Sequence, residues 1–146
     1  VPENIVPLFS LFALNNKDLT IYGDGKSVRD YLYVRDHCEA IDLILHEGKA
    51  GETYCVGGGS EKNGIEIADA ILLALPETKS EKKFVTDRPG HDLRYAIDHS
   101  KLTRELDYKP SVTFEEGLAK TVDWYKANEW WWEPIMADLY VPDFLK

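Results

Sequence analysis

The chain has 146 residues, of which 44% are hydrophobic and 29% charged, and this ordinary globular composition excludes a disordered polar tail and a fibrous repeat. The formal net charge of −9 opposes binding of nucleic acid or of an anionic membrane over the whole surface. No apolar run approaches the ~20 residues that span a bilayer, and residues 1–4 lack the basic start of a signal peptide. Two cysteines are too few for a disulfide framework. We therefore expect a soluble, cytoplasmic protein without nucleic-acid or membrane partners.

Hydrophobic spacing predicts the elements of the first part of the chain. Apolar residues at Ile5, Leu8, Phe9 and Phe12 predict a helix that ends at residues 15–17, and residues 19–22 read as a short strand closed by the turn 23–25. The apolar stripe of Val34, Cys38, Ile41 and Leu45 predicts a helix that runs to about Glu47 and stops at the following glycines. Residues 52–56 are rich in β-forming side chains and lie between glycines, so we expect a strand there.

The second part of the chain also alternates predicted helices with short strands. Asn63 and Glu66 have the spacing of a helix N-cap pair, and Pro76 ends the helix that they open. Residues 82–86 predict a strand, while residues 98–106 and 113–128 predict helices, the last with a capping box at Thr113 and Glu116. Alternating helices and short strands indicate an α/β fold without an internal repeat.

Several catalytic motifs fail on inspection. Tyr22 and Lys26 match a Tyr-x-x-x-Lys string, but two of the three residues between them are glycine, which breaks the helix that would place the lysine beside the phenol. The glycine run 57–59 lacks the spacing of a dinucleotide-binding loop and reads as a flexible turn. The four histidines lack zinc-site spacing, and no serine lies in a nucleophile elbow.

Two segments, 19–34 and 86–95, are dense in groups that bind an anion beside a flat ring. In the second, the sequence Arg88-Pro89-Gly90 predicts a rigid turn that presents a guanidinium and open backbone donors, and His91 adds a proton donor. Arginine forks bind phosphate oxygens in bidentate fashion, so two arginines from different segments could clamp a diphosphate. An equal alternative is that these are neighbouring charges on surface turns with no function.

The chain also resembles a known family through motifs that occur in the family order. They are PENIVPL (2–8), IYGDG (21–25), VRDYLYV (28–34), YCVGG (54–58) and DRPGHDLRYAID (87–98). Together they resemble the C-terminal part of the dTDP-glucose 4,6-dehydratases, which are extended short-chain dehydrogenases/reductases. The second and third motifs are shared with many nucleotide-sugar epimerases, decarboxylases and dehydratases, whereas the DRPGHDLRY run is much more specific.

The resemblance implies a substrate-binding role for residues 1–146, as a small domain of mixed helices and short strands with the Rossmann half absent. It implies that Asn4 and Ile5 border the nucleotide and that Thr20, Ile21 and Tyr22 line the thymine pocket. Arg29 and Arg88 would hold the diphosphate. The residues that would complete that side are Asp87, Pro89, Gly90, His91 and Tyr95. Cys55 stands where relatives usually carry an asparagine that contacts the diphosphate region, and a thiol is a weaker donor.

The resemblance also implies what lies elsewhere in the complete enzyme. An N-terminal Rossmann domain would bind NAD and carry the catalytic Tyr-x-x-x-Lys pair, so no residue of this chain is expected to be catalytic or to bind a cofactor or metal. The complete, usually homodimeric enzyme would convert dTDP-glucose to dTDP-4-dehydro-6-deoxyglucose and water in deoxysugar (rhamnose-type) biosynthesis. Two alternatives stay open, namely a related enzyme acting on UDP- or CDP-sugars and a non-catalytic sugar-nucleotide binding module.

A missing domain would leave exposed apolar surface on this part of the protein. The run Trp130-Trp131-Trp132 could belong to that surface, or it could pack the last helix against its own core. We favour packing because large aromatic side chains are usually buried.

Overall fold

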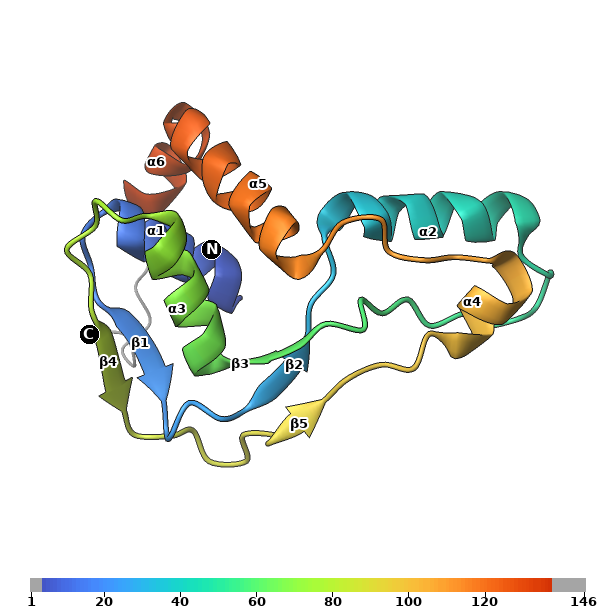
Figure 1. The fold of residues 1–146 in the computed structure, drawn as a ribbon, viewed down its shortest axis with the longest axis horizontal. Helices are drawn as coiled ribbons and strands as arrows, with labels where there is room; N and C mark the ends of the chain where they lie inside the picture. The colour runs from blue at the N-terminus through green and yellow to red at the C-terminus, as the bar shows by residue number, and fades with distance from the viewer. Residues whose placement is uncertain (1–3, 138–146) are drawn as a thin grey trace.

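The computed structural model describes residues 4–137, which form two lobes joined by long extended segments (Figure 1). The helical lobe contains α1, α3, α5 and α6 with strands β1 and β4, and the second lobe contains α2 and α4. In chain order the elements are α1 (Ile5–Leu14), β1 (Leu19–Tyr22), β2 (Val28–Asp30), α2 (Val34–Glu47), β3 (Glu61–Asn63), α3 (Gly64–Ala74), β4 (Lys82–Val85), β5 (Arg94–Tyr95), α4 (Ser100–Leu106), α5 (Phe114–Ala127) and α6 (Glu129–Ala137). Within residues 4–137, no helix is both long and apolar enough to cross a membrane.

The strands form two small sheets. β1 and β4 pair in parallel, with Tyr22 opposite Val85. In the other sheet β2 is central: it pairs antiparallel with β3 and parallel with β5. This second sheet lies between the two lobes, where segments from both of them meet (Figure 1).

Each lobe has its own apolar core. The larger core is in the helical lobe and consists of Phe9, Ala13, Leu19, Ile21, Ile67, Ala68, Ile71, Leu75, Leu118 and Val122. Among the described residues, the smaller core consists of Ala40, Leu102 and Tyr108, against which Tyr54 and Val56 pack. Since stabilisation scales with the apolar area removed from water, the helical lobe has the larger share of the hydrophobic stabilisation.

Both predicted capping boxes are present. The side chain of Asn63 accepts hydrogen bonds from the amides of Ile65 and Glu66, and the carboxylate of Glu66 accepts one from the amide of Asn63. Thr113 and Glu116 make the same exchange at the start of α5. These bonds satisfy amide groups that a helix N-terminus leaves without internal partners, and they fix where each helix begins.

The predicted strand at residues 52–56 is wrong, because this segment is extended but belongs to neither sheet. Tyr54 and Val56 point to the smaller core as alternate residues of a strand would, yet no strand of residues 4–137 lies alongside to pair with the backbone. β-forming side chains cannot make a strand without a neighbour.

Helix α2 is present as predicted, but its apolar stripe faces solvent. Val34, Ile41 and Leu45 are 64%, 52% and 77% exposed, and Cys38 is exposed as well. The opposite side of α2 packs on the smaller core through Ala40, Leu43 and Ile44.

The tryptophan run is divided between core and surface. Trp132 is buried and its indole nitrogen donates to the carbonyl oxygen of Tyr125, whereas Trp130 and Trp131 are exposed. The expected packing against the core therefore holds for one of the three.

Candidate functional site

The end of β1 brings four predicted residues together. The guanidinium carbon of Arg88 lies 5.1 Å from the centre of the Tyr22 ring, and His91 meets the same ring edge-on with 6.4 Å between centroids. His91 Nδ1 is 2.7 Å from a carboxylate oxygen of Asp87. This group of Tyr22, Asp87, Arg88 and His91 is called the Tyr22 cluster below.

The predicted rigid turn is present in the Tyr22 cluster. The amide of His91 donates to the carbonyl oxygen of Arg88 at 3.2 Å, and Gly90 has a φ of 73°. Pro at the second position and a left-handed Gly at the third are the signature of a type II turn. The turn holds Arg88 and His91 at its two ends, so both side chains can reach Tyr22.

Charge in the Tyr22 cluster is unevenly compensated. The hydrogen bond from His91 lowers the pKa of Asp87; desolvation opposes this effect, and the bond from the Arg88 amide adds to it. Asp87 is therefore ionised at neutral pH and engaged with His91. Among residues 4–137 the guanidinium of Arg88 has no carboxylate within ion-pair distance, which leaves its hydrogen-bond donors available to an anion.

Arg29 has a similar arrangement on the three-stranded sheet. Its guanidinium carbon lies 4.1 Å from the centre of the Tyr95 ring, and Nη1 donates to the carbonyl oxygen of Val28 at 2.7 Å. Burial raises the pKa of nearby Tyr31 to about 12, against the charge of Arg29, which lowers it. Tyr31 is therefore neutral and does not compensate the arginine. In the described part of the chain no carboxylate pairs with Arg29.

The remaining predicted residues lie outside the Tyr22 cluster. Thr20 shares the outer face of β1 with Tyr22, whereas the side chain of Ile21 is buried in the larger core. Asn4 and Ile5 lie at the start of α1, and Cys55 is exposed on the extended segment 52–56. The structure records no contact that joins Asn4, Ile5 or Cys55 to the Tyr22 cluster.

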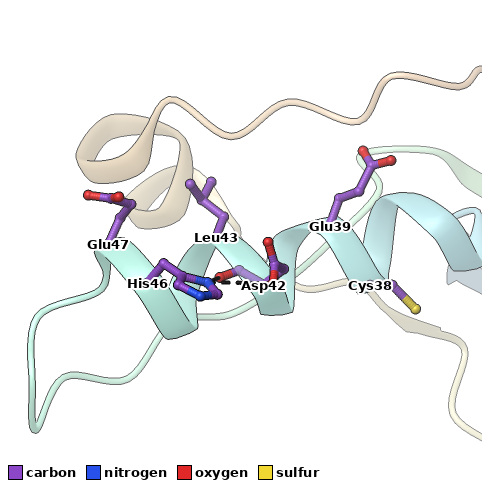
Figure 2. Close-up of a pocket in the computed structure, with 6 residues that line it drawn as sticks. All are labelled: Cys38, Glu39, Asp42, Leu43, His46 and Glu47. Atoms are coloured by element: carbon purple, nitrogen blue, oxygen red, sulfur yellow. Dashed lines mark hydrogen bonds and ion pairs between the residues drawn. The ribbon is translucent and has the colours of Figure 1, made fainter.

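A shallow hollow of about 580 Å³ lies elsewhere, on the surface of α2 (Figure 2). It is lined by Cys38, Glu39, Asp42, Leu43, His46 and Glu47. His46 is turned toward Asp42, with Nδ1 2.9 Å from its carbonyl oxygen. None of the predicted binding residues lines this hollow, and its three carboxylates would repel an anion. We assign it no ligand.

The glycine run 57–59 does not fit a dinucleotide. The two carboxylate oxygens of Asp30 accept hydrogen bonds from the amides of Gly58 and Ser60, each at 2.8 Å. A Cβ on Gly58 would lie against the carbonyl oxygen of Tyr31, so this glycine serves close packing of the chain on itself. Because these donors are already used, the described residues offer NAD no diphosphate cradle here. Residues 4–137 also contain no group of three or more ligating side chains that could hold a metal ion.

Comparison with known proteins gives the family. The model described as GDP-mannose 4,6 dehydratase matches residues 1–121. The chain belongs to this family. The motif-based resemblance to dTDP-glucose 4,6-dehydratases is confirmed by individual relatives and solved structures.

A dTDP-glucose 4,6-dehydratase of Xanthomonas campestris is 49% identical over 148 aligned residues, which cover 95% of this chain and 42% of the relative. The crystal structure of the Bacillus anthracis dTDP-glucose 4,6-dehydratase in complex with NAD matches with a TM-score of 0.84 at 49% identity, over 92% of this chain and 42% of that one. The Streptomyces venezuelae enzyme with NAD and TYD bound gives the same TM-score and coverage at 45% identity. The predicted α/β fold is thus confirmed, and the chain spans about two fifths of the length of these relatives.

Sequence reasoning missed two residues that the structure brings to this region. Asp30 holds the turn 57–60 in place, and Lys62 lies directly opposite Arg29 in the sheet register. Both depend on pairings of strands β2 and β3, which are only three residues long. Runs this short carry too little alternation to be recognised as strands from the sequence.

Proposed function

We propose that residues 1–146 form the sugar-nucleotide-binding domain of a dTDP-glucose 4,6-dehydratase. The complete enzyme would convert dTDP-glucose to dTDP-4-dehydro-6-deoxyglucose and water with bound NAD, in deoxysugar (rhamnose-type) biosynthesis. The observation that carries the proposal is the placement of Arg29 and Arg88, each on a tyrosine ring and neither with a carboxylate partner in the described chain. In a protein of net charge −9, two such arginines are suited to a small anion held locally.

Each side chain has a distinct part in this proposal. Arg29 and Arg88 bind the diphosphate oxygens, and the ring of Tyr22 packs against the thymine base on the face that Arg88 leaves open. Asp87 fixes the orientation of His91 through the 2.7 Å hydrogen bond, so the other ring nitrogen can turn to the ligand. Binding and orientation of the substrate are the contributions of this chain; proton transfer belongs to residues outside it.

We also propose that the rest of the protein, an N-terminal Rossmann domain that binds NAD, covers the exposed stripe of α2. Val34, Cys38, Ile41 and Leu45 form a continuous apolar strip on a helix whose other side is packed. Exposed apolar surface of this kind marks an interaction face. The relatives are more than twice as long as the matched region, so the part of them outside this region is long enough to form such a domain.

The experiment is a titration of the chain with dTDP-glucose and, in parallel, UDP-glucose, followed by amide NMR shifts. We expect saturable shifts at Tyr22, Arg29 and Arg88, stronger with the thymidine ligand. Arg88→Ala should weaken binding by about 1.5–3 kcal/mol, the value of a charge-assisted hydrogen bond. Arg104→Ala is the matched control, because Arg104 is an exposed arginine on α4.

Three results would change the conclusion. An equal response to both sugars would favour an enzyme acting on UDP- or CDP-sugars, and Cys55, which replaces the usual asparagine, would then be the first position to restore. Unchanged affinity in Arg88→Ala would remove Arg88 from the site. Absence of any response to either ligand would contradict binding by this chain.

A further inference from the structure

One row of side chains crosses the three-stranded sheet. The register places Lys62 of β3 opposite Arg29 of β2, and Arg29 opposite Tyr95 of β5. Residues that are directly opposite in neighbouring strands project from the same face, with their Cβ atoms about 4.5–5.5 Å apart in an antiparallel pair. Lys62, Arg29 and Tyr95 therefore stand side by side on one face of the sheet.

Both cations of this row lie against aromatic rings. Arg29 lies on Tyr95, and the ammonium of Lys62 lies 5.3 Å from the centre of the Phe114 ring. Phe114 in turn meets Tyr31 edge-on, with 5.9 Å between centroids, and Tyr31 is close enough to Arg29 for that charge to act on its pKa. Each cation therefore lies against an aromatic ring, and of the Arg29 nitrogens only Nη1 makes a hydrogen bond within the described residues.

Two cations at opposed positions repel each other and weaken the strand pairing. Little on this face offsets the repulsion. Arg29 has no carboxylate partner within residues 4–137, and Lys62 has only Glu115, at 3.8 Å, whose own side chain is 73% exposed. The Lys62 side chain is 28% exposed, and an ion pair at that distance with one partner largely in solvent contributes little. The pair of cations becomes favourable when an anion lies between them.

We propose that Lys62 is a further cationic ligand of the diphosphate group, acting beside Arg29 and in addition to Arg88. The inference deepens the proposed function and rests on it: it adds to the site a residue that the sequence motifs did not assign. A diphosphate suits the pair because it carries charge on two linked phosphoryl groups, and a lysine can bind one of them as a point charge while the arginine fork binds the other.

The test is the affinity of the chain for dTDP and for inorganic pyrophosphate, measured by calorimetry, together with the melting temperature of the unliganded protein. Lys62→Met should lower the affinity for both ligands by about 10- to 150-fold, the loss expected for one charge-assisted hydrogen bond. It should leave the unliganded melting temperature unchanged or raise it, because the repulsion from Arg29 is removed. Lys62→Arg keeps the charge and should retain affinity within about threefold of wild type.

Lys101→Met is the matched control. Lys101 also lies over an aromatic ring, 4.6 Å from the centre of Tyr54, and its ammonium is 2.7 Å from a carboxylate oxygen of Glu52. Lys101 lies on α4, outside the three-stranded sheet, so Lys101→Met should keep its affinity for both ligands. It should lose stability because the ion pair with Glu52 is removed.

The outcomes separate this inference from the proposed function. If Arg29→Ala abolishes binding while Lys62→Met binds as tightly as the wild type, the role of Lys62 is refuted and the proposed function stands. A Lys62→Met protein that melts at a lower temperature with unchanged affinity would show that Lys62 only attaches β3 to α5. If Arg29→Ala also binds normally, the proposed diphosphate site itself is refuted.

Discussion

Asp36 is the buried carboxylate on which the attachment of α2 depends. It is 1% exposed, and it accepts three hydrogen bonds from the segment that leads into α5. One carboxylate oxygen accepts from the hydroxyl of Ser111 at 2.6 Å and from its amide at 3.1 Å, and the other accepts from the amide of Val112 at 3.1 Å. Asp36 lies in the first turn of α2 and thereby joins the lobe of α2 and α4 to the helical lobe. The start of α2 and the start of α5 lie near each other in Figure 1.

The substitution Asp36→Asn should lower the free energy of unfolding by a predictable amount. If the amide oxygen takes the place that faces Ser111, the new NH₂ group faces the amide N–H of Val112, and two donors then meet. One charge-assisted hydrogen bond is lost and a buried donor is left without a partner, which should lower the free energy of unfolding by about 1.5–3 kcal/mol. This is a measurable fraction of the ~5–15 kcal/mol that stabilises a typical domain.

The cost should also depend on pH. Burial alone would raise the pKa of Asp36, but the hydrogen bonds from Ser111 and Val112 and the charge of Lys120 outweigh burial and lower it. A carboxylate with a lowered folded-state pKa stabilises the fold fully above its unfolded pKa of about 3.9 and loses that contribution as the pH falls through the folded value. Since the asparagine of the variant does not titrate, the difference in stability between wild type and variant should shrink as the pH falls below about 3.9.

Urea unfolding followed by far-ultraviolet circular dichroism, at about pH 7 and in a series down to about pH 3, measures both effects. Asp42→Asn is the matched control. It removes the same charge from the same helix, but the side chain of Asp42 is 77% exposed. We expect that control to stay within about 0.5 kcal/mol of wild type. If Asp36→Asn matches it at neutral pH, the three hydrogen bonds do not hold α2 in the way described.

Two further predictions concern the start of α3 and the exposed side of α2. Asn63→Ala removes the acceptor of two helix amides, so it should destabilise the protein by about 1 kcal/mol in urea unfolding, and a change below about 0.3 kcal/mol would contradict the role of the cap. The double variant Ile41→Lys with Leu45→Lys should self-associate less than wild type in sedimentation velocity while unfolding at the same urea concentration, because both side chains face solvent. Equal association of the two proteins would mean that this strip is not an adhesive surface.

Long periodic segments were predictable from the sequence, and short paired ones were not. The five helices predicted from apolar spacing and caps are all present, as are strands β1 and β4, because each carries enough residues for its period to be visible. Strands β2, β3 and β5 have two or three residues each and exist only through their partners. Helix α6 is not predicted from the sequence, because Pro134 and the tryptophan run 130–132, which both lie inside it, hide the helical period.

In the candidate site too, features that depend on local sequence could be predicted, and contacts between distant segments could not. The turn of Arg88, Pro89 and Gly90 could be predicted because Pro and Gly restrict the backbone locally. That Arg88 lies over Tyr22, and that Lys62 lies beside Arg29, follows from contacts between segments far apart in the chain. The strand expected at residues 52–56 shows the converse, since its local preference is clear and no partner strand lies within residues 4–137.

The position of the tryptophans has a consequence for spectroscopy. All four, Trp124, Trp130, Trp131 and Trp132, belong to α5 and α6, and the first and third meet edge-on with 5.2 Å between centroids. Intrinsic fluorescence therefore reports on one end of the helical lobe and is insensitive to α2 and α4. With separate cores in the two lobes, an emission-monitored melt can give a single sharp transition while the smaller core has already opened. A complete record of unfolding needs a second probe, such as a fluorophore attached to the exposed thiol of Cys38.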